Sequence, residues 1–240
     1  MSKNNRKGKN TSSSPSSLIG TRKESSLHRS LKYRYSGEGG STETMVGEYV
    51  CDGITESGEF IEVQTGSFGP LKDKIQEISQ KSKVRIIHPI IAQKYIELYD
   101  TDGRLIHRRI SPQKGKVWNL FNVLIYAPKL PLLKNLTIEL AVIDAIEKRV
   151  NDGSGSWRRK GVSIADRSLG AWHQSLILKK PRDYYRFIPF EKDEPFTVRN
   201  LAEKAELKNA LSRKTIYVLE KMNLLERVGK QGKAFVYKRL

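Results

Sequence analysis

The sequence has 240 residues, 38% of them hydrophobic, which suffices for one moderate core and a small second domain. Lys and Arg residues number 44 against 26 Asp and Glu residues, and the resulting formal net charge of +18 is typical of a protein with a polyanionic partner. No segment approaches the roughly 20 apolar residues that span a bilayer, and the N-terminus lacks the apolar core of a secretory signal. We therefore expect a soluble, cytoplasmic protein that binds nucleic acid rather than a membrane.

The N-terminal region predicts a tail followed by a helix. Residues 1–19 contain Ser, Asn, Lys, Gly and Pro with hardly any large apolar side chain, so we expect a disordered basic tail. Over 24–35, the apolar residues Leu27, Leu31 and Tyr35 recur every four positions, which indicates an amphipathic helix.

The next segments predict an α/β arrangement, because strand patterns rich in β-branched and aromatic residues alternate with a helical pattern. A hairpin that turns at Asp102–Gly103 should end this part of the chain. The expected order is strands at 42–46, 48–55 and 59–66, a helix within 69–83, a strand at 83–90 and the hairpin within 93–111.

Residues 116–150 are harder to assign, because short apolar runs are ambiguous by period alone. "KVWNLFNVLIYA" is interpreted as helical and "NLTIELAVIDAI" as a strand. "NDGSGSWRRKG" is expected to be a flexible, basic surface loop, and "DRSLGAWHQSLIL" is predicted to be a helix.

The C-terminal pattern predicts a winged helix-turn-helix. Thr197 can cap a short helix, a second helix is expected over 208–222, and a basic hairpin follows around Gly229 and Gly232. The domain hypothesis is a tail at 1–19, an α/β domain at 20–150, a basic loop and helical connector at 151–190, and a winged helix-turn-helix at 191–240.

The stretch "VCDGITESGEFIEVQTGSF" places acids on a hairpin. If 56–58 is a three-residue loop with Gly58 in the left-handed conformation, Asp52 lies opposite Glu62, and Gln64 joins the same face. A two-residue loop would instead send the two acids to opposite faces. Two neighbouring carboxylates repel each other, so one takes up a proton or both share a cation, for which Mg²⁺ is suited. The alternative is a solvated hairpin whose acids face water.

The run "GTRKESSLHRSL", followed by Asp52 and "EVQ", resembles the PD-(D/E)XK nuclease superfamily of restriction-endonuclease-like and Holliday-junction-resolvase-like enzymes. The resemblance implies a restriction-endonuclease-like mixed-sheet core with the order helix, three strands, helix and strand. It also implies that Glu24, Asp52 and Glu62 are the family's acids, and that Asp52 and Glu62 bind Mg²⁺ or Mn²⁺. Over most of the chain, "EVQTGSF", "RRISPQKG", "SWRRKG" and the C-terminal "PFT" unit resemble an uncharacterised bacterial family without known activity.

The family's usual lysine, two positions after the last acid, is Gln64 in this chain. Glutamine can orient a water but cannot lend positive charge, so Lys74 on the next helix is expected to stabilise developing phosphate charge. Glu43 is interpreted as an exposed strand acid, with a place at the same site as the alternative. His28 is interpreted as solvated, with contact to substrate phosphate as its alternative.

Basic residues of the C-terminal unit are expected to contact nucleic acid, with DNA as the expected form. Arg213 and Lys214 lie near the start of the presumed recognition helix, and Lys230 and Lys233 would tip the wing.

The sequence thus predicts a metal-dependent nuclease-like DNA-binding protein that hydrolyses phosphodiester bonds. The alternative is a catalytically inactive winged-helix DNA-binding or regulatory protein on a degenerate nuclease fold. An RNA-processing or membrane-surface protein is a third class with only the charge in its favour, and a homodimer is left open.

Overall fold

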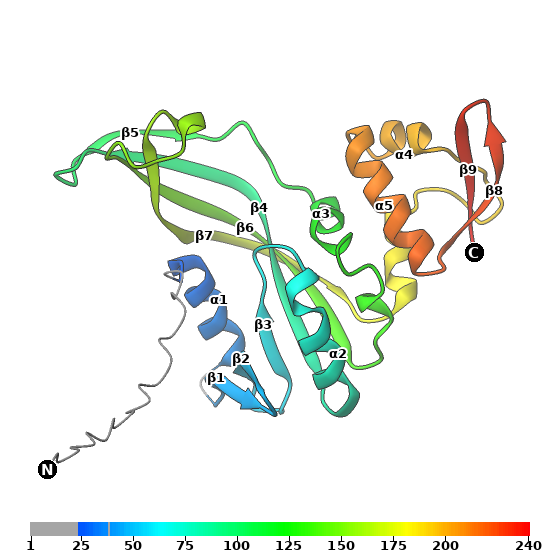
Figure 1. Cartoon of the computed structure of the whole chain (residues 1–240), viewed down its shortest axis with the longest axis horizontal. Helices are drawn as coiled ribbons and strands as arrows, with labels where there is room; N and C mark the ends of the chain where they lie inside the picture. Colours follow the sequence, from blue (N-terminus) through cyan, green and yellow to red (C-terminus); the bar gives the residue numbers. More distant parts are fainter. Residues whose placement is uncertain (1–23, 38) are drawn as a thin grey trace, which may run out of the picture.

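The computed structural model describes residues 24–37 and 39–240, so the predicted tail at 1–19 lies outside the described residues. The chain forms a seven-stranded mixed sheet, followed by a small unit of two helices and a two-stranded hairpin (Figure 1). The fold is therefore mixed α/β, as predicted. In the described part of the chain, no helix is both long enough and apolar enough to cross a membrane.

The first half of the chain supplies one edge and the centre of the sheet. In chain order it contains α1 (Ser26–Ser36), β1 (Ser41–Val46), β2 (Tyr49–Ile54), β3 (Phe60–Val63), α2 (Lys72–Lys81), β4 (Val84–Tyr99) and β5 (Leu105–Ile110).

The second half completes the sheet and adds the C-terminal unit. It contains α3 (Leu120–Leu124), the short 3-10 helix η3 (Leu130–Leu132), β6 (Leu136–Asn151), β7 (Val162–Leu178), the 3-10 helix η5 (Pro181–Phe187), α4 (Val198–Lys204), α5 (Asn209–Lys221), β8 (Leu225–Gln231) and β9 (Ala234–Arg239).

The strand order is β1-β2-β3-β4-β6-β7, and β5 pairs with the far half of β4. Strands β3, β4 and β6 run parallel, whereas β1, β2 and β7 run antiparallel to their neighbours. Alternate residues of the strands face two apolar clusters. On one face, Leu27 and Leu31 of α1 pack against Ile61 and Val63 of β3. On the other face, α2 contributes Ile75 to a larger core.

The β2–β3 hairpin has the predicted three-residue loop. Gly58 has a φ of 78°, and the Thr55 amide donates a hydrogen bond to the Glu59 carbonyl at 2.9 Å. The first cross-strand pairs are therefore those expected, including Gly53 opposite Ile61. The pairing does not extend to Asp52 and Glu62, so the prediction that these two acids lie directly opposite each other on one face is wrong.

The predicted helix "DRSLGAWHQSLIL" is wrong, because these residues belong to β7. Leu169 and Trp172 are three residues apart and both pack on the α1 face, a spacing that imitates a helical stripe. In the structure, Trp172 pairs with Ile143 and Leu169 pairs with Ala145, and the register shifts between the two pairs. A β-bulge therefore turns both side chains to one side. The helical part of the predicted connector is corrected accordingly.

The far halves of β4, β6 and β7 extend, together with β5, beyond the α-helices as an arm built mainly of sheet (Figure 1). Glu147 is buried in this arm and accepts hydrogen bonds from Arg149, Arg167 and Lys94. Burial opposes ionisation, but the two arginines and the Lys94 charge outweigh it and lower the pKa of Glu147 to about 2. A single carboxylate thus holds three cations within the arm.

The C-terminal unit has the predicted order of helix, helix and hairpin. Thr197 caps α4 by accepting a hydrogen bond from the Asn200 amide at 3.3 Å. Phe196 forms an antiparallel bridge with Tyr237 of β9, which ties the start of the unit to its end. Its core is continuous with that of the sheet, since Ile216 of α5 belongs to the same apolar cluster as the buried residues of α2 and α3.

Candidate functional site

Three charged or polar residues at a spacing of four face the sheet: Glu24, which precedes the N-cap of α1, and His28 and Lys32 within the helix. Ser25 caps the helix by accepting a hydrogen bond from the His28 amide. Leu27 and Leu31 hold the adjacent face of the helix against the sheet, so the polar stripe lies over β1 and β2. Together with Glu43 of β1 and Asp52 of β2, these three residues form what we call the α1 cluster.

Asp52 lies at the centre of the α1 cluster. Its Oδ2 accepts a hydrogen bond from the Val63 amide at 2.8 Å, so the side chain binds the backbone of β3. The same oxygen lies 3.2 Å from His28 Nε2, and Oδ1 lies 3.4 Å from Lys32 Nζ. Burial raises the pKa of Asp52, but the hydrogen bonds of His28 and Val63 and the charges of His28 and Lys32 lower it overall. Asp52 is therefore ionised at neutral pH.

His28 is a cation in this cluster. Its Nδ1 lies 2.6 Å from Glu24 Oε1, and its Nε2 lies 2.8 Å from the Val63 carbonyl oxygen. Both ring nitrogens face acceptors, so the imidazolium form satisfies both. Burial lowers the pKa of His28, but Asp52, Glu24 and the Val63 carbonyl raise it from 6.5 to about 9. The interpretation of His28 as a solvated residue is wrong.

The Lys32 ammonium occupies the point where three carboxylates converge. It lies 3.3 Å from Glu24, 3.3 Å from Glu43 and 3.4 Å from Asp52. The residue is only 7% exposed, whereas the side chain of Glu43 points largely into solvent. Burial lowers the pKa of Lys32, and the charges of Asp52 and Glu24 with the hydrogen bond of Glu43 raise it. The α1 cluster thus carries its own buried cation.

Glu62 is held from the opposite face of the sheet. Its neighbours on β3, Ile61 and Val63, face α1, so Glu62 points toward α2, where Lys74 Nζ donates a hydrogen bond to its Oε2. Lys74 also donates to the Val50 carbonyl at 2.7 Å. Burial and the nearby charge of Asp52 raise the pKa of Glu62, and Lys74 opposes them. The two acids influence each other, but each has its own cation.

Gln64 is engaged within its own loop. Its side-chain Nε2 donates a hydrogen bond to the Ser67 backbone carbonyl at 2.6 Å, and the Gln64 backbone carbonyl accepts one from His88 Nδ1 at 2.6 Å. The structure thus brings Glu24 and Asp52 together, sets Glu62 and Lys74 on the opposite, α2 face of the sheet, and ties the Gln64 side-chain amide to its own loop.

The residues around Asp52 do not match the ligand set expected for Mg²⁺. Among residues 24–37 and 39–240, no three His, Cys, Asp or Glu side chains are placed to hold a metal ion. The position where Glu24, Glu43 and Asp52 converge is filled by the Lys32 ammonium, and His28 takes a further lone pair of Asp52. The donor set as folded does not fit Mg²⁺, because the ion would have to displace side-chain cations.

The predicted nucleic-acid contacts differ in their surroundings. Arg213 is exposed on α5, and Lys230 and Lys233 are exposed on the β8–β9 hairpin. Lys214 is only partly exposed, and its Nζ donates a hydrogen bond to Asn122 Oδ1 of α3 at 2.8 Å. Lys214 therefore faces the sheet domain.

Sequence reasoning overlooked Lys32 and undervalued His28. The available signal was the spacing Glu24, His28, Lys32, which parallels the apolar pair Leu27 and Leu31 one position earlier. A polar stripe beside a buried stripe lies at the edge of the helix contact, where it reaches the neighbouring strands.

Fold and site define a mixed α/β protein with a charged cluster between α1 and β2 and a C-terminal helix–helix–hairpin unit. The chain belongs to the family described as "Domain of unknown function (DUF8091)", whose model matches residues 25–179. The match covers α1 through β7 and includes every residue of the α1 cluster except Glu24.

The chain is also similar to a protein of Treponema pallidum (strain Nichols) that carries the description "Uncharacterized protein". The two are 29% identical over 151 residues, which represent 63% of this chain and 60% of the relative. The similarity therefore leaves about 40% of the relative's length unmatched. No solved structure matches the chain.

Proposed function

We propose that this protein binds nucleic acid through a restriction-endonuclease-like core and a C-terminal winged helix. The observation that carries the proposal is the exposed basic surface of the C-terminal unit, where Arg213, Lys230 and Lys233 project from the second helix and the hairpin. The net charge of +18 supports a polyanionic partner. Bridging of Phe196 to Tyr237 supports the winged-helix assignment, because it adds a short third strand to the hairpin.

The order helix, three strands, helix and parallel strand in α1 through β4 supports the nuclease-like core, since it is the order that the sequence resemblance implies. Fold alone does not establish an activity. DNA is the proposed partner because winged helices place exposed cations of the second helix and of the wing against DNA.

Replacing Arg213, Lys230 and Lys233 together with alanine is expected to weaken DNA binding and to flatten its salt dependence. Each lost phosphate contact reduces the slope of log affinity against log salt by about 0.9, so three should reduce it by roughly 2 to 3. Fluorescence anisotropy with labelled duplexes from about 50 to 200 mM salt measures the slope.

A matched control variant carries alanine at Lys81, Lys134 and Lys148, three exposed lysines outside the C-terminal unit. This control variant loses the same formal charge as the first variant. Its three lysines make none of the proposed phosphate contacts, so its salt-dependence slope should stay near that of the wild type. An equal effect of both triple variants would show that the C-terminal unit has no special part in binding.

A second candidate function is metal-dependent hydrolysis of phosphodiester bonds. Its support is that α1, β2, β3 and α2 bring Glu24, Asp52, Glu62 and Lys74 to one region of the sheet. Against it stands the Lys32 ammonium, which fills the position of a shared cation. The nucleic-acid-binding function does not depend on this second candidate.

Incubation with Mg²⁺ or Mn²⁺ and labelled duplex, single-stranded, branched and RNA substrates tests this candidate. If it holds, the wild type cuts a substrate, and Asp52→Asn and Glu62→Gln each lower the rate by at least about a hundredfold, as expected for loss of a ligand to a metal ion that would polarise the phosphodiester. Absence of cutting, or cutting that persists in both variants, would remove catalysis and leave the binding protein. The Lys81→Ala protein is the control.

A further inference from the structure

A groove separates α5 from η3 and from the start of α2. It consists of two hollows with volumes of 640 Å³ and 530 Å³. Both hollows are lined by Lys129, Leu132, Tyr217 and Lys221, so they form one continuous groove. In Figure 1, α5 lies beside α3, between the sheet and the β8–β9 hairpin.

The groove exists because α5 is fixed against the sheet domain. Lys214 of α5 donates its hydrogen bond to Asn122 of α3, which holds the first half of the helix. Arg213, Tyr217 and Lys221 follow one another at a spacing of four and form an exposed stripe along α5. Tyr217 and Lys221 line the groove. The second half of the predicted recognition helix is therefore one wall of a groove.

The charge of the groove is positive. Lys72 of α2, Lys129 and Lys221 line the first hollow, and Arg227 lines the second. Glu220 lines the second hollow as well, but it is paired with Arg227 at 3.3 Å. Three lysines are left to compensate an anionic ligand, so the groove is complementary to a polyanion.

Exposed aromatic rings distinguish this groove from a merely basic surface. Tyr126 is 64% exposed and Tyr217 is 40% exposed, and both line the first hollow. Lys221 Nζ lies over the Tyr217 ring, 5.7 Å from its centroid, so a cation accompanies the aromatic ring in the groove. Unpaired bases stack on such rings, while the phosphates that link them bind the neighbouring cations.

We propose that this groove binds single-stranded nucleic acid. Bases stack on Tyr126 and Tyr217, and phosphates contact Lys129 and Lys221. A duplex keeps its bases paired inside, so it offers no free base to the two tyrosines. The inference rests on the proposed nucleic-acid-binding function, to which it adds a site and a strand form. Lys72, at the start of α2, lines the same groove and supplies a third lysine next to the bound strand.

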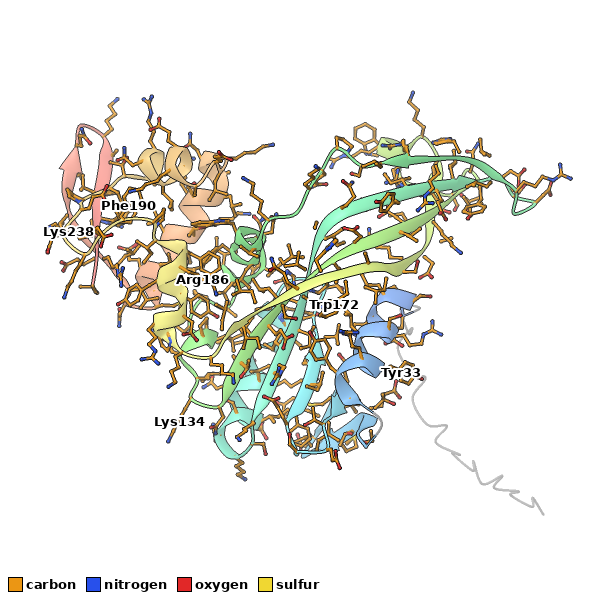
Figure 2. All side chains as sticks on the ribbon, turned by 180° about the vertical axis from the view of Figure 1, so that it is seen from behind. Tyr33, Lys134, Trp172, Arg186, Phe190 and Lys238 are labelled. Carbon is orange, nitrogen blue, oxygen red and sulfur yellow. The ribbon has the colours of Figure 1, made fainter. Side chains whose placement is uncertain are left out.

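The test compares a Tyr126→Ala, Tyr217→Ala double variant with the wild type. Fluorescence anisotropy measures binding of labelled oligothymidine, oligouridine and a hairpin duplex, with polyglutamate as an acidic-peptide probe. Affinity for the single strands should fall at least about tenfold, because two stacking faces are lost, while duplex affinity should change less than about threefold. Tyr33→Ala is the matched control, since Tyr33 is 65% exposed on α1, far from the C-terminal unit (Figure 2).

The outcomes separate this inference from the proposed function. If the wild type binds nucleic acid and the double variant binds single strands equally well, the groove is not the site, and the nucleic-acid-binding function stands. If the wild type binds no nucleic acid at all, that function is wrong as well. Displacement of the oligonucleotide by polyglutamate at equal charge would overturn the inference in favour of an acidic-peptide groove. An unchanged melting temperature of the double variant shows that its fold is intact.

Discussion

Replacing Lys32 with methionine is expected to lower the free energy of unfolding by about 3 kcal/mol at neutral pH. The ammonium lies within 3.4 Å of carboxylate oxygens of Glu24, Glu43 and Asp52. Methionine retains an apolar stem of similar length, but it leaves these acids without their shared cation. The loss is costly chiefly because Asp52, the most buried of the three acids, stays desolvated with one cation fewer. Urea denaturation monitored by circular dichroism measures the effect.

Lys81→Met is the matched control for this prediction. Lys81 is exposed at the end of α2, and its replacement should change the free energy of unfolding by no more than about 0.5 kcal/mol. If both variants lose similarly little, Lys32 does not balance the three carboxylates. Mg²⁺ gives a second readout, because an ion that enters the gap left by the ammonium should raise the melting temperature of Lys32→Met above that of the metal-free variant.

The second large effect is a pH dependence of stability that His28 causes. The folded protein raises the pKa of His28 from 6.5 to about 9, so the folded state binds this proton more tightly than the unfolded state. The stabilisation is complete below pH 6.5 and is lost as the pH rises through 9. The shift corresponds to roughly 3 kcal/mol, since one pKa unit equals about 1.4 kcal/mol.

A His28→Asn variant should therefore be less stable than the wild type by about 3 kcal/mol more below pH 6.5 than above pH 9. Urea unfolding at several pH values measures this difference. Burial lowers the pKa of His88, so this residue also makes stability depend on pH, in the range below 6.5. That effect is the same in the wild type and in His28→Asn, and it cancels in the comparison. His107→Asn, at an exposed position of β5, is the control. A gap between wild type and His28→Asn that does not change with pH would show that folding leaves the pKa of His28 unshifted.

Features that depend only on residues close together in the sequence were predicted correctly. Gly58 and the three-residue loop fix the β2–β3 register, which depends only on residues near one another in the sequence. The same holds for the α1 stripe of Leu27 and Leu31 and for the Thr197 cap. These features follow from turn chemistry, helical periodicity and capping.

The features that escaped prediction depend on distant partners. The bulge opposite β6 sets Leu169 and Trp172 on one side of β7, and nothing within their own segment indicates it. Figure 2 shows Trp172 on β7, and its ring packs against Tyr35 of α1 at a centroid distance of 6.0 Å. Lys214 likewise meets Asn122 across a long sequence separation.

The α1 cluster contains both residues that the sequence predicted and residues that it did not. Asp52 was identified from its place on the hairpin, and the structure sets it beside Glu24. The cations His28 and Lys32 were not assigned to it, because a polar residue on a helix is ambiguous until its neighbours across the sheet are known. The resemblance to nucleases implies roles for the acids, but none for the two cations that balance their charge.

The parallel pairing of β4 with β6 has a consequence for how the protein acquires its structure. β4 is the central strand, yet its long partner is made only after β5 and α3 have been synthesised. Pairing between such distant segments carries a large loop-closure cost and is slow. Until β6 arrives, one edge of β4 is unpaired and exposes Ile86, Ile87 and Ile90, which are buried in the finished protein. The nascent chain therefore passes through a stage that is prone to aggregation, and recovery of soluble protein should depend on concentration and temperature during refolding.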